Sequence, residues 1–88
     1  SEKELELLGT VYQNFPSSDQ QRYDELYLKL RDEKILQEEH QELLELVDKA
    51  ERHNMEWLKA LAELAALRGV SVEKLKQDLG VENPPLKV

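Results

Sequence analysis

The stretch of sequence from Gln37 to Arg68 contains neither glycine nor proline, and this feature most limits what the chain can fold into. Leucine, alanine and other apolar residues recur along it every three or four positions, as they do on one face of an α-helix. Gly69 follows directly, and glycine is the residue that most often ends a helix. The sequence therefore predicts one long helix over about 37–68.

Two shorter helices are predicted before this segment. Ser1 and Glu4 form a capping box at the start of the first helix. We expect that helix to end at Pro16, because the residue before a proline is disfavoured in a helix. The second helix should begin at about Ser18, within a run of N-cap residues, and continue to about Lys34. Its apolar stripe contains Tyr23, Leu26, Tyr27 and Leu30.

A short fourth helix should follow the long one. Ser71 is a good N-cap residue and Gly80 is a good stop, so this helix is predicted over about 71–79. Two prolines then predict an extended tail over 81–88. The predicted fold class is all-α, with a long central helix, an N-terminal helical hairpin packed along it and the short C-terminal helix. We expect a single helical domain over 1–80.

The composition limits the location and the partners of the chain. Among 88 residues, 12 are basic and 19 acidic, which gives a net charge of −7 and disfavours binding to nucleic acid phosphates. The chain has no cysteine, no apolar run long enough to cross a membrane, and no secretion signal in its first residues, SEKELELL. We expect a cytoplasmic protein with no membrane contact.

The long helix raises the question of what covers it. A helix of this length measures about 45 Å, whereas a compact chain of this size has a radius of gyration of about 12 Å. Either the first helix turns at Pro16 and covers the far half, or a second copy of the chain does. Spacings of four and three residues favour a heptad seam and a homodimer, with Asn54 fixing the register. The candidate dimer or partner seam contains Leu43, Val47, Ala50, Asn54, Trp57, Leu61 and Leu64.

A simpler interpretation remains open for this stripe. Heptad and ordinary helical periods cannot be distinguished over three heptads, and Asn54 would then face solvent. Trp57 is expected in the core, although tryptophan is also favoured at binding interfaces. The tyrosines are expected in the core with their hydroxyls at its edge.

No catalytic, cofactor-binding or metal-binding residue is assigned. Glu38, Glu39 and His40 are consecutive and therefore point in different directions from a helix. Neither His40 nor His53 has a carboxylate three or four residues before it, and both are expected on exposed helix faces. The serines are explained as helix caps, and no glycine-rich loop precedes a helix. We expect a non-enzymatic protein.

The segment 61–79 has the spacing of a helix-turn-helix, with Gly69 at the turn. Candidate DNA contacts in the second helix would be Lys74, Lys76 and Gln77. Acidic residues balance the lysines in that helix, so the charge does not support DNA binding. A DNA-binding transcriptional regulator is the alternative function.

Three segments, QQRYDELYLKL, EEHQELLEL and LAALRGVS, resemble a group of small helical proteins common in cyanobacteria. Their shared pattern is R-Y-x-E-L, then E-E-H-x-E-L-L, then L-R-G-V-S, although relatives tend to have a threonine cap where this chain has Gln37. Their genes often lie beside genes for HNH-type nucleases. The resemblance implies a protein–protein interaction module, an antitoxin-like partner of a nuclease or toxin.

Overall fold

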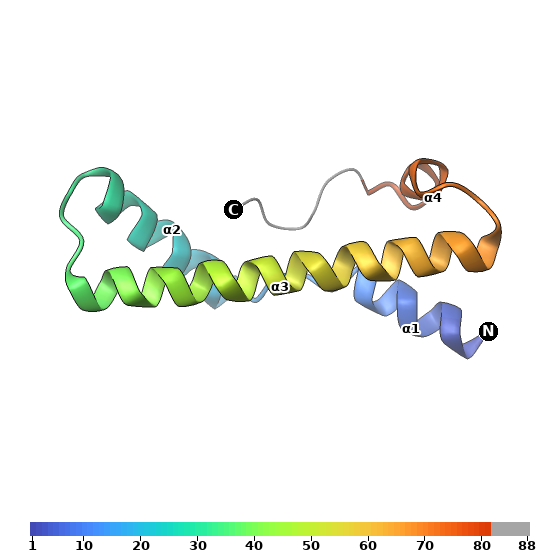
Figure 1. Ribbon diagram of the computed structural model, residues 1–88, viewed down its shortest axis with the longest axis horizontal. Helices are drawn as coiled ribbons and strands as arrows, with labels where there is room; N and C mark the ends of the chain where they lie inside the picture. Colours follow the sequence, from blue (N-terminus) through green and yellow to red (C-terminus); the bar gives the residue numbers. More distant parts are fainter. Residues whose placement is uncertain (82–88) are drawn as a thin grey trace. The chain divides into compact units, whose positions relative to one another are not determined.

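The computed structural model describes residues 1–81, and all the regular structure in this range is helical (Figure 1). The all-α prediction is confirmed, and the long helix occupies the predicted range. The predicted tail lies outside the described residues except for Val81. The helices are α1 (Glu2–Val11), α2 (Ser17–Arg31), α3 (Gln37–Arg68) and α4 (Val72–Leu79).

The two ends of α3 are stabilised by different means. At the start, the carboxylate of Glu39 accepts a hydrogen bond of 3.0 Å from the backbone N–H of Leu36. This is the glutamate half of a capping box, in which the carboxylate of the third helical residue satisfies the N–H of the N-cap residue. At the end, Gly69 adopts a left-handed φ of 67°, and the N–H of Val70 bonds the carbonyl of Ala65 at 3.0 Å. Glycine permits this turn because it has no Cβ.

The predicted ends of α1 and α2 need correction. The first helix ends at Val11, well before Pro16, and Phe15 buries its ring in the connection between the helices. The second helix begins at Ser17, and Pro16 holds its N-cap position without a side-chain cap bond. Proline suits the start of a helix because the missing N–H would have no partner there. The predicted cap residues at 17–19 are therefore part of the helix itself.

The turn after α2 is made without glycine. Glu33 adopts a φ of 58°, in the left-handed region, and the N–H of Lys34 bonds the carbonyl of Lys29 at 2.8 Å. The helix consequently ends at Arg31, before the predicted Lys34. This geometry is the one that glycine usually provides at a helix C-terminus.

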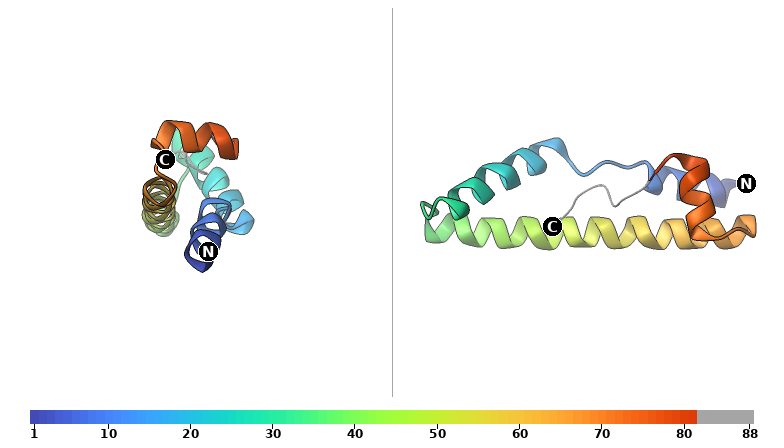
Figure 2. Two further views of the ribbon diagram at one scale, coloured as in Figure 1. Left: turned by 90° about the vertical axis from the view of Figure 1, so that its right-hand side faces the viewer. Right: turned by 90° about the horizontal axis from the view of Figure 1, so that it is seen from above.

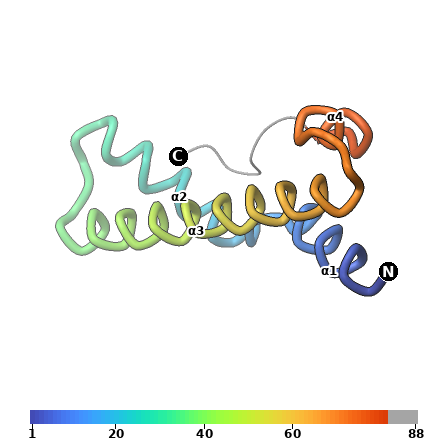
Figure 3. Tube along the Cα trace, turned by 45° about the vertical axis from the view of Figure 1, so that its right-hand side comes forward, coloured from blue at the N-terminus to red at the C-terminus, as the bar shows by residue number. Residues whose placement is uncertain are grey.

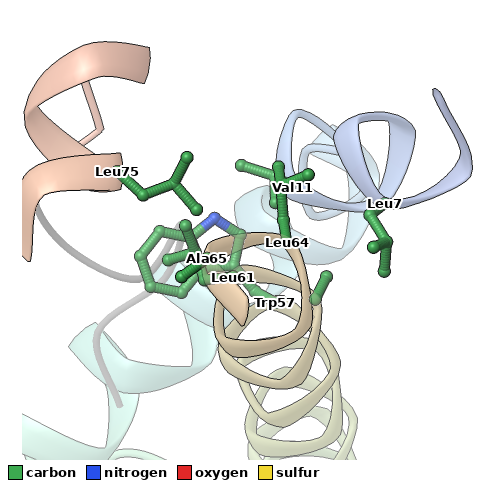
Figure 4. Packing of buried hydrophobic residues seen from close by; sticks show 8 residues of the cluster. Leu7, Val11, Trp57, Leu61, Leu64, Ala65 and Leu75 are labelled. Carbon is green, nitrogen blue, oxygen red and sulfur yellow. The ribbon is translucent and has the colours of Figure 1, made fainter. Parts of the chain in front are cut away.

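The described residues form two compact units, and α3 contributes to both. The first contains 1–13 and 54–81, and within it α4 crosses the C-terminal part of α3 (Figure 2). Side chains from α1 and α4 point toward those of α3 in a shared core (Figure 4). The buried members are Leu7, Val11, Trp57, Ala60, Leu61, Leu64, Ala65 and Leu75.

The second unit contains residues 14–53, in which the chain turns back after α2 so that the N-terminal part of α3 lies beside it (Figure 3). Its buried cluster consists of Leu26, Leu43 and Leu46, with Tyr23, Ile35 and Val47 packed against it. Of the predicted α2 stripe, Leu26 is buried and Tyr23 partly so, whereas Tyr27 and Leu30 are exposed. The prediction of a single domain over 1–80 stays a prediction.

Candidate interaction surfaces

The residues of the predicted seam form one stripe along α3, its inner face, and each of them is buried or half-buried. Leu43 packs against Leu26 of α2, while Trp57, Leu61 and Leu64 pack in the core with α1 and α4. Ala50 is also buried, and Val47 and Asn54 are half-buried. The C-terminal part of the stripe is therefore covered by α1, the alternative to a second copy. The homodimer itself stays a prediction, but burial of this stripe does not require a second copy of the chain.

The candidate DNA contacts are not arranged as a basic surface. The Nζ of Lys74 lies 3.0 Å from the carboxylate of Asp78, one turn along α4. Lys76 is half-buried, and with Gln77 it lines a shallow hollow that also includes Glu73. Ser71 caps the helix as predicted, because its hydroxyl accepts a hydrogen bond from the Lys74 N–H at 3.1 Å. These contacts stabilise a helical corner.

The two histidines occupy different environments. His40 is exposed, as predicted, but the prediction for His53 is wrong. The His53 ring is half-buried edge-on to Phe15, with centroids 5.5 Å apart, and neither ring nitrogen has a hydrogen-bond partner within 1–81. In the same range, no three histidine or carboxylate side chains are grouped so that they could hold a metal ion.

A cluster of ion pairs joins α2 to α3 along one side of the second unit. The guanidinium of Arg22 binds the Glu42 carboxylate, with Nε 2.7 Å from Oε2 and Nη2 2.9 Å from Oε1. Lys29 binds Glu39 at 2.5 Å, and Arg22 lies 3.9 Å from the same carboxylate. Beyond these, Lys49 binds Asp19. The sequence does not reveal this cluster, because the partners are on different helices and no short motif links them.

These contacts change the acid–base properties of the carboxylates. The hydrogen bond from Lys29, followed by that from the Leu36 N–H, lowers the pKa of Glu39 below its ordinary value. The hydrogen bond from Arg22 likewise lowers the pKa of Glu42. Both effects favour the charged form, which the cations and the N–H stabilise directly.

Two surfaces of the second unit carry exposed charged and apolar groups whose contacts within the chain are with near neighbours in the sequence, such as the stacking of Tyr27 on Tyr23 with ring centroids 6.2 Å apart. One lies on α3 and is rich in carboxylates; we call it the acidic face, and it consists of Glu38, Gln41, Leu44, Glu45 and Asp48, all exposed. The other lies on α2 opposite Leu26; we call it the outer face of α2, and it consists of Asp24, Tyr27, Leu28 and Arg31, also all exposed.

No protein-family model matches the chain, and neither a curated protein nor a solved structure matches it. Within the described part of the chain, none of the helices combines the length and the apolar character needed to cross a membrane.

Proposed function

We propose that the protein is a non-enzymatic interaction module that binds a basic protein partner, as an antitoxin-like protein binds a nuclease. The resemblance to the cyanobacterial proteins suggests this class of partner. The observation that carries the proposal is the acidic face of α3, which presents three carboxylates and one leucine on adjacent turns. Its leucine, Leu44, is 51% exposed.

The charge of the second unit supports this choice of partner. Residues 14–53 contain eleven acidic and six basic residues, so most of the net charge of the chain lies there. Five of the six basic residues, Arg22, Lys29, Arg31, Lys49 and Arg52, are in ion pairs with carboxylates of the same unit. Glu38 and Glu45 take part in no ion pair among the described residues. A cationic surface would find these two carboxylates available.

The expected mode of action is competition. A nuclease holds its substrate through Lys and Arg contacts to phosphates, and an acidic protein face can occupy the same cations. Complementary charge raises the rate of encounter and makes the affinity sensitive to salt. Leu44 would add apolar contact at the centre of the face, where water is excluded.

The test is capture of the neighbouring gene's product on the immobilised chain, at low and high salt. A variant with Glu38→Lys and Glu45→Lys should weaken binding by at least about tenfold, which is about 1.4 kcal/mol. The matched control carries Glu2→Lys and Glu6→Lys, which change the net charge equally at exposed positions of α1, outside the acidic face. No binding at low salt, or equal losses in both variants, would contradict the proposal.

A further inference from the structure

The outer face of α2 has a pattern that the structure of one chain does not explain. Its four residues are spaced i, i+3, i+4 and i+7, so they share one side of the helix. The side chains of Tyr27 and Leu28 are 51% and 47% exposed, at the centre of the face. Asp24 lies one turn before this pair and Arg31 one turn after it.

The two charged residues of this face make only weak contacts within the chain. Asp24 accepts a hydrogen bond of 3.0 Å from Gln20, and no cation pairs with it among the described residues. The Nε of Arg31 lies 3.4 Å from the carboxylate of its neighbour Asp32, and both side chains are more than half exposed. Such exposed pairs contribute little. In contrast, Arg22 and Lys29 of the same helix are committed to carboxylates of α3.

We propose that the outer face of α2 binds the same face of a second copy of this chain, with the two helices antiparallel. A two-fold axis between Tyr27 and Leu28 places each Tyr27 against Leu28 of the partner subunit. The same axis places Asp24 opposite Arg31 of the partner subunit, twice over, because the contact is isologous. The face is thus complementary to itself in both charge and apolar character.

The charges also select the orientation of the two helices. Parallel α2 helices would bring Asp24 next to the partner's Asp24 and Arg31 next to the partner's Arg31, which is repulsive. Contact between two short helices buries less than the roughly 1,200 Å² of a standard interface, so the dimer is expected to be weak and reversible. This inference goes beyond the proposed function, because it uses a different helix and does not require the basic partner.

Sedimentation equilibrium of the full chain over a range up to high micromolar concentration tests the proposal. The unaltered chain should associate reversibly to twice its monomer mass. Asp24→Arg and Arg31→Asp should each weaken self-association by about tenfold or more, because two like charges then meet at both ends of the contact. Mixing these two variants should restore a dimer containing one of each, since opposite charges then face one another. A chain that carries both exchanges should also dimerise.

Matched controls separate this contact from general charge effects. Glu6→Arg on α1 and Arg52→Asp on α3 make the same changes in charge away from the outer face of α2, and should leave self-association unchanged. Far-UV circular dichroism shows that each variant keeps its helices. A monomer at every concentration, a mixture that associates no better than its components, or an equal effect of the controls would each overturn the proposal. None of these results bears on binding at Glu38 and Glu45.

Discussion

Arg22 of α2 and Glu42 of α3 form a two-pronged ion pair, in which Nε and Nη2 donate to the two carboxylate oxygens at 2.7 and 2.9 Å. This geometry matches a planar guanidinium to a planar carboxylate and fixes the relative orientation of the two side chains. The third nitrogen, Nη1, donates to Glu25 at 3.2 Å. The pair therefore links residues 20 positions apart and connects α2 to α3 along one side of the second unit.

The first prediction concerns acid. The pKa values of Glu39 and Glu42 are lowered in the folded chain, so both carboxylates stabilise the fold fully above their ordinary pKa of 4.5. This contribution is lost as the pH falls through the lowered folded-state values. The melting temperature, followed by circular dichroism, should consequently fall between about pH 5 and pH 2.

A Glu42→Gln variant provides the comparison for this titration. It should melt at a lower temperature than the unaltered chain at pH 7, because Arg22 loses its charged partner. Its melting temperature should then fall less on acidification, since one of the two titrating carboxylates is gone. Parallel curves for the two proteins would show that the Arg22–Glu42 pair contributes nothing to the acid response.

The second prediction concerns the left-handed residue in the α2–α3 turn. Glu33 holds a φ of 58°, which disfavours a residue with a Cβ by roughly 1 kcal/mol. Glu33→Gly should therefore raise the free energy of unfolding by about 0.5–1 kcal/mol in urea titrations. Lys34→Gly, one residue later and outside the positive-φ region, should lower it. The opposite order of the two variants would refute the assigned role of Glu33.

The third prediction distinguishes a core tryptophan from an interface tryptophan. Trp57 is 2% exposed in the core of the first unit, so Trp57→Ala should lower the free energy of unfolding by about 3–5 kcal/mol. The loss should be the same at every low micromolar concentration, because the side chain packs within one chain. Met55→Ala, at a position 59% exposed, should change stability by less than about 0.5 kcal/mol. If Trp57→Ala removed a concentration dependence of the unfolding midpoint, Trp57 would belong to a dimer seam.

The fourth prediction concerns the imidazole of His53. Its two ring nitrogens are buried without a hydrogen-bond partner in the described chain, which carries a desolvation penalty. His53→Leu keeps an apolar contact with Phe15 and removes the penalty, so unfolding should require about 1 kcal/mol more. His40→Leu, at an exposed position, serves as the control and should have little effect. A loss of stability in His53→Leu would mean that the ring makes a polar contact of value.

The long helix was predictable because its evidence is local. An uninterrupted apolar period and a following glycine determine the range of α3, and Ser71 and Gly80 determine α4 in the same way. The break after α2 was harder to place, because Glu33 adopts a conformation for which the sequence carries no signal. The end of α1 at Val11 is also unmarked in the sequence, because neither glycine nor proline stands at 12–15.

The inner face of α3 shows the limit of periodicity as evidence. The spacing identified Leu43, Trp57, Leu61 and Leu64 as one buried face, which agrees with the structure. It could not identify what covers that face, because a helix of the same chain and a second copy demand the same apolar pattern. For the outer face of α2, the same kind of spacing gave a wrong prediction. Tyr27 was expected inside because its spacing fitted the core, yet half of its surface is exposed.

The carboxylate of Glu39 binds both the Lys29 ammonium of α2 and the backbone N–H of Leu36 at the start of α3. A thermal fluctuation that moves this carboxylate away uncaps α3 and loosens α2 in the same event. The amide proton of Leu36 can exchange with solvent deuterium only while that hydrogen bond is open. The exchange rate of this one proton therefore reports how often the carboxylate of Glu39 leaves the start of α3.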